Sequence, residues 1–189
     1  MRPSIQAISS LAAILSSGLL VPSAMADDRD HQVQARLSGF NEVHFSSGPP
    51  ATLRGAVSTT ASGTFSAKIF DRSDLIRYEL RYRDLEGTVS QAHIHFGQHH
   101  TVGGIVVWLC ETLGTPAPPA VADLTPLCPE EGVVTGSITP AQVLSATGQG
   151  LDAGEFDELV RAIRAGATYA NVHSSLFPPG EVRGQIDRR

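Results

Sequence analysis

The sequence predicts an antiparallel all-β domain with one or two short connecting helices. Three observations support this prediction: short runs that alternate apolar and polar residues, breaks between them rich in Gly, Pro, Ser and Asp, and few stretches with helical spacing. The clearest run covers residues 76–83, where Ile, Tyr, Leu and Tyr alternate with Arg, Glu, Arg and Arg. One face of this strand should pack and the other should meet water.

Eight such runs within one domain indicate a sandwich or a barrel. They cover residues 32–38, 63–70, 76–83, 88–96, 104–109, 133–138, 167–173 and 181–186. The period changes to a helical one at 156–163, with Asp152 and Glu155 resembling a capping box ahead of it and Gly166 as the stop. A second helical turn is expected at 139–146, where Thr139 can cap and Pro140 suits the first helical position.

The N-terminus has the order of a secretory signal. Arg2 is followed by an uncharged apolar stretch over 5–21 and by a small-residue site at 24–26. We therefore expect a signal peptide at 1–26, a mature domain at 27–189, and a secreted or periplasmic location. An uncleaved membrane anchor is the alternative, but the stretch is short for a span, and no later segment is apolar enough to cross a membrane.

The cysteines and the charge narrow the function further. Cys110 and Cys128 are the two cysteines of the chain, and export places them where a pair normally forms a disulfide. Closing a loop of about 18 residues would contribute on the order of 3 kcal/mol. A thiolate metal site is the alternative, although the spacing matches neither a redox nor a zinc pattern. The formal net charge of -5 argues against a nucleic-acid partner.

Two histidines offer the first candidate chemistry. His93 and His95 lie two apart in a predicted strand, so their imidazoles project from the same face. Two neighbouring imidazoles form a natural half-site for copper or zinc. The alternative is a pair of polar side chains on a solvated or hydrogen-bonded face. His99 and His100 follow in a polar turn, and an exposed loop accounts for them.

Four segments carry a resemblance to a known family. They are LSGFNEV at 37–43, AHIHFG at 92–97, NVH at 171–173 and PGEVRGQI at 179–186. In this order they resemble the CHRD domain, named from chordin, over nearly the whole mature chain. The resemblance implies an immunoglobulin-like or superoxide-dismutase-like β-sandwich in an exported protein, with no enzymatic activity established across the family. The family's first motif usually continues with prolines, whereas this chain has His44 and Phe45, which adds an imidazole near Glu42.

A more distant likeness is to copper-zinc superoxide dismutase, which also carries a His-x-His on its copper strand. This likeness implies that His93, His95 and His173 are copper ligands and that Arg183 lies nearby to attract anions. Glu42 and His44 are additional candidates for the site. The sequence holds no convincing zinc subsite, which argues against dismutation. Glu181 and Arg183 project to one face, and a cross-strand ion pair is the alternative for them.

Three functions therefore stay open. The first is an exported CHRD-type binding protein that holds copper through its histidine cluster. The second is a structural or interaction domain whose histidines stabilise the fold through hydrogen bonds. The third, which the sequence favours least, is a redox enzyme of the dismutase type. The protein partner is not predicted.

Overall fold

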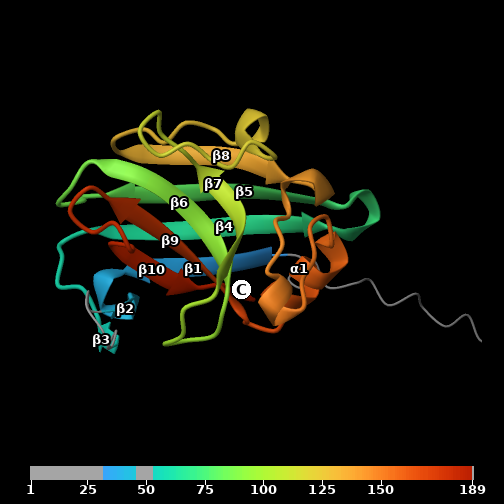
Figure 1. Cartoon of the computed structure of the whole chain (residues 1–189), viewed down its shortest axis with the longest axis horizontal. Coiled ribbons are helices and arrows are strands. Elements are labelled where there is room, and N and C mark those ends of the chain that lie inside the picture. The colour runs from blue at the N-terminus through green and yellow to red at the C-terminus, as the bar shows by residue number, and fades with distance from the viewer. Residues whose placement is uncertain (1–31, 46–52, 189) are drawn as a thin grey trace, which may run out of the picture.

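The computed structural model describes residues 32–45 and 53–188 (Figure 1). The predicted signal peptide at 1–26 lies outside these described residues, so the expected processing and export stay predictions. Within the part of the chain that is described, no helix is long and apolar enough to cross a membrane.

The described residues form eleven strands, and all eight predicted runs are among them. Their bounds are β1 Gln32–Ser38, β2 His44–Phe45, β3 Leu53–Gly55, β4 Ser62–Phe70, β5 Leu75–Arg83, β6 Val89–Phe96, β7 Gly104–Cys110, β8 Gly132–Ile138, β9 Thr168–Ser174, β10 Val182–Gln185 and β11 Asp187–Arg188. The small β2–β3 pair and β11 were not predicted, because two or three residues are too few to show an alternation.

Nine strands form one antiparallel sheet in the order β7-β6-β9-β10-β1-β4-β5-β8, with β11 paired to β1. The sheet turns back on itself between β10 and β1, which pair at Ser38 and Arg183. We call β7, β6, β9 and β10 the front layer and β1, β4, β5 and β8 the back layer. The front strands cross the back strands in Figure 1, and β7 comes close to β8. The result is a nearly closed barrel, flattened like a sandwich, which confirms the all-β prediction.

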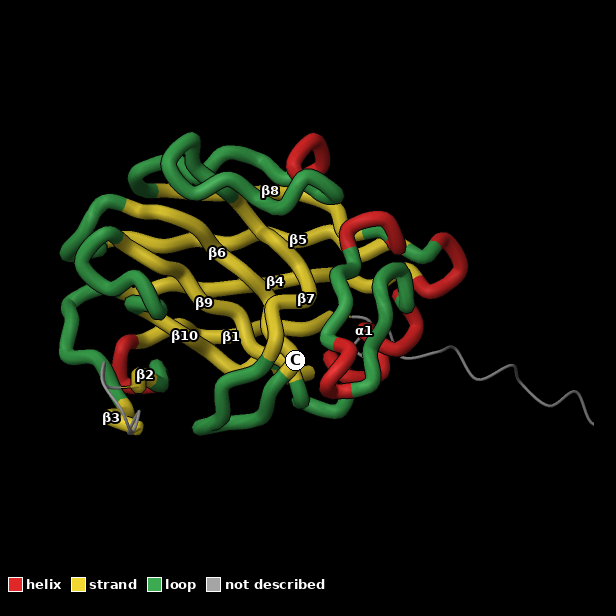
Figure 2. Tube along the Cα trace, in the orientation of Figure 1, coloured by secondary structure: helices red, strands yellow, loops and turns green. Residues whose placement is uncertain are grey.

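The predicted helix is α1, Phe156–Arg164, which lies at one end of the sheet (Figure 2). One half of the expected capping box forms ahead of it, since the backbone N–H of Asp152 donates to the Glu155 carboxylate at 2.9 Å, but α1 itself is preceded by Glu155 without a side-chain cap. Gly166 takes a positive φ of 66° after the last turn, as a helix stop requires. Phe156, Leu159 and Ile163 are buried and close this end of the core.

The second predicted helical turn, at 139–146, is a single 3-10 turn over Pro140–Gln142. Thr139 and Gln142 form the capping box that starts it. The turn does not continue because the backbone N–H of Leu144 donates to the carbonyl of Val106 in β7 at 2.9 Å. This segment therefore bonds to the front layer instead of to itself.

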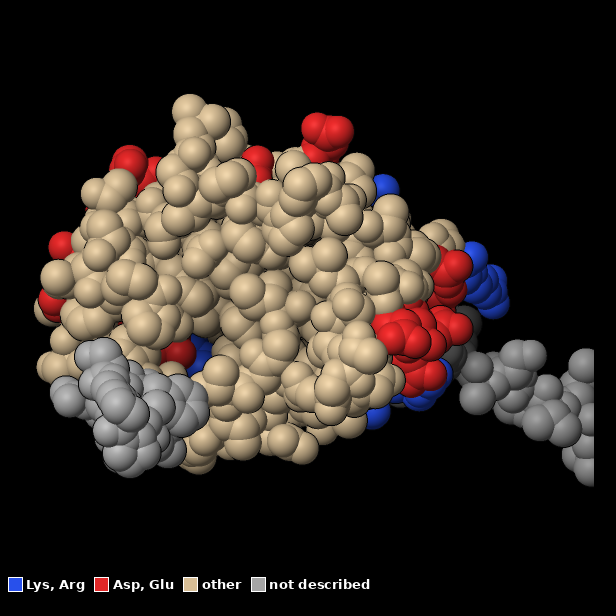
Figure 3. Space-filling view, viewed as in Figure 1, with Lys and Arg blue, Asp and Glu red and all other residues tan. Residues whose placement is uncertain are grey.

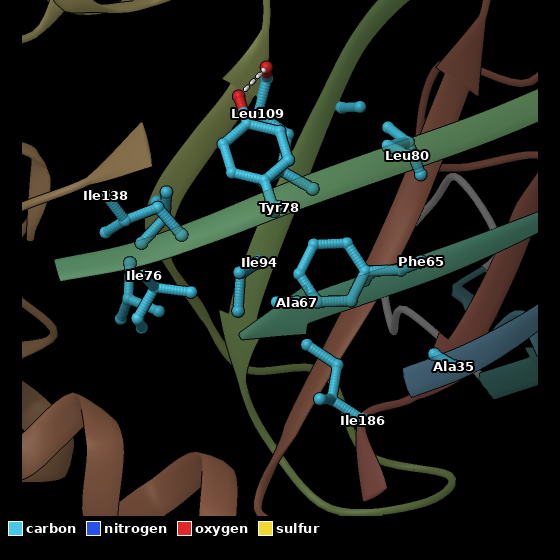
Figure 4. Packing of buried hydrophobic residues seen from close by; sticks show 14 of the residues in the cluster. Ala35, Phe65, Ala67, Ile76, Tyr78, Leu80, Ile94, Leu109, Ile138 and Ile186 are labelled. Carbon is cyan, nitrogen blue, oxygen red and sulfur yellow. Dashed lines mark hydrogen bonds between the residues drawn. The ribbon is translucent and has the colours of Figure 1, made fainter. Parts of the chain in front are cut away.

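The core lies between the two layers (Figure 4). Phe65 and Leu80 of the back layer pack with Ile94 and Leu109 of the front layer in one buried cluster. Tyr78 reaches across from β5, and its hydroxyl donates to the carbonyl oxygen of Leu109 in β7 at 2.7 Å. This bond satisfies the buried hydroxyl and ties the two layers together.

The predicted disulfide is present. Cys110, at the end of β7, and Cys128 are joined with an S–S distance of 2.01 Å. The loop between them also bonds to itself, because the N–H of Cys128 donates to the carbonyl of Glu111 at 2.8 Å. The disulfide therefore fixes the long segment that follows the front layer before the chain enters β8.

The two layers differ in what covers their outer faces. Along β5 in the back layer, core residues alternate with residues that reach solvent. In β9 and β10 every residue is buried. Chain segments 97–103 and 177–181, together with the turn at 39–42, make hydrogen bonds or contacts with this part of the front layer. A polar outer face is therefore enclosed there.

Candidate metal centre

His93 and His95 project from the enclosed outer face of the front layer, as their spacing in β6 predicts. Ile94 between them is fully buried in the core, whereas the two imidazoles lie on the other side of the sheet. The neighbouring strand β9 supplies His173, which pairs in register with Gln91. His93, His95 and His173 are 0, 7 and 5% exposed, so the three imidazoles are almost entirely shielded from water.

The three imidazoles converge on one point. The ring centroid of His93 lies 4.8 Å from that of His173 and 5.5 Å from that of His95, and His95 and His173 are 6.3 Å apart. One nitrogen from each ring lies within 4.8 Å of the others. Three atoms bonded to one ion at about 2 Å are at most about 4 Å apart, so a closure of about 1 Å would complete a site.

Backbone carbonyls fix the orientation of two rings. Nδ1 of His95 donates to the carbonyl of Gly103 at 2.9 Å, and Nδ1 of His173 donates to the carbonyl of Pro178 at 2.8 Å. A carbonyl oxygen only accepts, so both rings carry their proton on Nδ1 and leave Nε2 with a lone pair. A hydrogen bond of this kind behind each ring is the usual support of a histidine that ligates a metal.

The third ring completes the donor set. Nδ1 of His93 lies 3.1 Å from Nε2 of His173, and since that Nε2 carries a lone pair, His93 donates. Two nitrogens 3.1 Å apart would subtend an angle of about 100° at an ion about 2 Å from each. An ion could lie between them once the proton of His93 moves from Nδ1 to Nε2, so that Nδ1 offers its lone pair. Nε2 of His95 and Nε2 of His93 are both buried without a hydrogen-bond partner, and that of His95 is free to ligate.

Burial keeps the triad neutral. It lowers the pKa of His93 well below 6.5, helped by the neighbouring His173 and His95. Burial also lowers the pKa of His95 to about 4, although the hydrogen bond to the Gly103 carbonyl acts to raise it. The pKa of His173 is lowered by burial as well. At neutral pH all three rings are therefore deprotonated and able to ligate. The sequence alone suggested titration near ~6.5, and the enclosed site moves this to more acidic pH.

Arg183 lies beside the triad and holds its surroundings in place. It is 2% exposed, and its guanidinium donates to the carbonyls of Thr101 at 2.7 Å and Gln98 at 2.9 Å. Its Cζ lies 3.3 Å from the ring centroid of Tyr169, and that ring stacks on His95 with centroids 4.7 Å apart. Arg183 has no lone pair to offer a metal. In this structure it anchors the segment that carries Gly103 and, through Tyr169, positions His95.

Glu42 and His44 lie outside the triad. Nε2 of His44 donates to the carbonyl of Gly180 at 2.6 Å, so it is engaged with the backbone. Glu42 is 4% exposed, and burial raises the pKa of its carboxyl to about 7. The Val43 N–H and Arg183 act to lower this pKa, but burial has the larger effect. A Cβ on Gly180 would lie 2.5 Å from Oε2 of Glu42, so the close approach and its φ of 133° require glycine there.

The remaining predictions concern Glu181 and Arg183, and the two loop histidines. The described contacts contain no cross-strand ion pair at Glu181 or Arg183. Arg183 donates to backbone carbonyls, and Glu181 accepts from the Thr59 hydroxyl at 2.7 Å and the Glu86 N–H at 2.8 Å. Both carboxyl and guanidinium find nearer partners in the covering segments. His99 and His100 are exposed in the β6–β7 loop, as predicted, and do not join the triad.

Sequence reasoning missed several groups around the triad. Tyr169 and Asn171 alternate with His173 along β9 and so share its face. That period-two pattern was readable in the sequence. Trp108, in β7, places its ring centroid 4.3 Å from that of His93. The carbonyls of Gly103 and Pro178 carried no signal, because any residue has a carbonyl and its direction depends on the loop.

A nearly closed β-sandwich with a disulfide and an enclosed cluster of nitrogen donors defines a small all-β binding domain. The family model of the CHRD domain matches residues 33–186, and the chain belongs to this family. CHRD domains are typically extracellular modules that bind or interact with other molecules. Comparison with curated proteins and with solved structures finds no match.

Proposed function

We propose that this chain is an exported CHRD domain that binds one copper ion through His93, His95 and His173. The observation that carries the proposal is the convergence of three buried, neutral imidazoles, two of which have their Nδ1 occupied by a backbone carbonyl. Enclosing three such groups costs conformational entropy and desolvation. A bound ion would offset that cost.

The donor set favours copper over zinc. Three imidazole nitrogens suit both ions, but affinity rises along the first-row series to copper and falls again at zinc. Copper would supply the site with an ion that changes oxidation state, and the three histidines would hold it away from bulk water. Arg183 and Tyr169 position His95, while the Pro178 carbonyl orients His173.

Tryptophan fluorescence offers a direct test. The chain has one tryptophan, Trp108, and its ring is 4.3 Å from the ring of His93, so Cu(II) in the triad should quench the emission. We expect saturation at one equivalent of Cu(II) and weaker binding of Zn(II) in competition. Each of His93→Ala, His95→Ala and His173→Ala should weaken copper binding more than about 100-fold. The double variant His99→Ala/His100→Ala is the matched control and should bind as the parent does.

The structural alternative predicts a different result. It draws support from the 3.1 Å hydrogen bond between His93 and His173, which stabilises the fold without a metal. Under the copper proposal, excess Cu(II) raises the Tm of the parent by mass action and does not raise that of His95→Ala. If copper leaves the parent's Tm and fluorescence unchanged, the structural role stands. Superoxide turnover by copper-loaded protein would instead support the dismutase alternative.

A further inference from the structure

A trough follows β4 on the outer face of the back layer, on the opposite side of the domain from the histidines. Its floor consists of small residues, Ser62, Gly63, Thr64 and Ser66. The trough consists of two neighbouring hollows, and the larger has a volume of about 980 Å³. Strand β1 forms one wall and β5 the other, because both pair with β4 along its length. The trough is therefore about two strand spacings wide, or roughly 10 Å.

Basic side chains dominate the walls of this trough. Thr64 lies in register with Arg36 of β1 on one side and Arg81 of β5 on the other. The basic residues of this face are Arg36, Lys68, Arg77, Arg81 and Arg83. The nearby carboxylates are Glu79, which pairs with Arg81 at 2.8 Å, Asp84, which lies 3.8 Å from Arg83, Glu131 at the rim, and Asp187, which is in register with Gln34. A positive face on a chain of net charge -5 favours an anionic partner.

We propose that this trough binds a linear anionic polysaccharide whose sugars carry carboxylates. Guanidinium groups match carboxylates in a bidentate geometry, and the hydroxyls of the floor can bond to sugar hydroxyls. Arg81 already binds Glu79 through two nitrogens, so Arg36 and Arg83 are the cations that a polymer would meet. They lie in register with Thr64 and Ser62 of β4, two residues or about 7 Å apart along the trough. A polymer with regularly spaced carboxylates can meet these cations in succession.

The lining of the trough argues against a single-stranded nucleic acid as the occupant. Proteins that bind such strands stack the bases on exposed aromatic rings. The aromatic residues in the lining are Tyr78 and Tyr82, which are 5 and 2% exposed because their rings face the core. The trough therefore offers charge and hydroxyls, which suit a charged glycan, and no accessible aromatic platform.

The test is calorimetric titration of the mature protein with polygalacturonate at about 50 and 200 mM salt. We expect binding that weakens as salt increases, and no binding of uncharged dextran. Arg36→Gln/Arg83→Gln, which removes one cation from each wall, should weaken binding about tenfold and flatten the salt dependence. The matched control is Arg161→Gln, which removes an exposed cation from α1 and should bind as the parent does.

Three outcomes would overturn the proposal. The first is no detectable binding of polygalacturonate at the lower salt concentration. The second is equal loss of binding in the trough variant and in Arg161→Gln, which would indicate attraction without a site. The third is tighter, trough-dependent binding of single-stranded DNA or of a second copy of this chain. None of these results depends on copper, because the histidines lie on the other face.

Discussion

The front and back layers belong to one antiparallel sheet, but their outward-facing polar side chains are buried in the front layer and exposed in the back layer. In the back layer, outer residues such as Thr64 and Arg81 are exposed, so water satisfies them. In the front layer, His93, Asn171 and Arg183 are at most 2% exposed. A buried polar group needs a specific partner in the protein or a ligand. The same alternation therefore produces a solvated surface in one layer and a candidate site in the other.

Removing Arg183 should give the largest effect and would break the front layer's arrangement. Arg183→Ala removes the guanidinium donor to the carbonyl of Thr101 and exposes the face of Tyr169, whereas the carbonyl of Gln98 keeps the bonds from the N–H and hydroxyl of Thr101. We expect a loss of about 3–5 kcal/mol in the free energy of unfolding, measured with urea on the copper-free protein. Arg183→Lys keeps the charge but not the planar fork, so its loss should be intermediate. A loss below about 1 kcal/mol for Arg183→Ala would contradict this account.

Gly103→Ala should have the second largest effect. An added Cβ would overlap the carbonyl of Phe96, so the segment that orients His95 must shift. The expected cost is about 2–3 kcal/mol, together with a copper affinity about tenfold lower. Gly114→Ala is the control, because an added Cβ there meets nothing within 4 Å. Equal stabilities of the two variants would contradict the prediction.

Acid should destabilise the copper-free protein through the front layer. Burial lowers the pKa of the three imidazoles, that of His95 to about 4, so between pH 6.5 and 4 the unfolded chain binds protons that the folded chain does not. Glu42 acts the other way, since burial raises its pKa from 4.5 to about 7. Three imidazoles outweigh one carboxyl, and we expect a net loss of about 2 kcal/mol between pH 6.5 and 4.5. Urea midpoints that stay constant or rise over this interval would refute the prediction.

Arg81→Ala should give the smallest effect and would sharpen the contrast. Arg81 and its partner Glu79 have side chains 55 and 39% exposed, so solvent screens their ion pair. The expected change in unfolding free energy is therefore close to zero. Urea denaturation beside Arg183→Ala measures both layers in one series. A loss of stability comparable to that of Arg183→Ala would mean that the back layer also depends on its outer polar contacts.

The same contrast explains what the sequence could predict. The alternation over 76–83 identified β5, because in the back layer polarity and exposure coincide. His93 and His95 were placed on one face for the same reason, and the pattern of β9 would have added Tyr169. The sequence could not tell that this face is enclosed. That depends on loops such as 97–103, whose path is set by long-range contacts from Arg183.

Charge illustrates the same limit. Figure 3 shows a front face that carries few charged side chains, with acidic groups gathered near α1. The net charge of -5 is an average and gave no sign that basic residues collect over the back layer. The trough became visible only when the strand order placed β1 and β5 on either side of β4. Strand order depends on pairing between residues distant in the chain, which local patterns do not contain.

Because one sheet folds into two stacked layers, the domain has two different outer faces. The outer face of the back layer and the outer face of the front layer point away from each other (Figure 1). A domain resting with β4 against a glycan matrix would turn its histidines toward the surrounding fluid. Attachment and ion capture would then proceed on opposite sides without obstructing one another, and a matrix coated with the protein would present a uniformly oriented layer of metal sites.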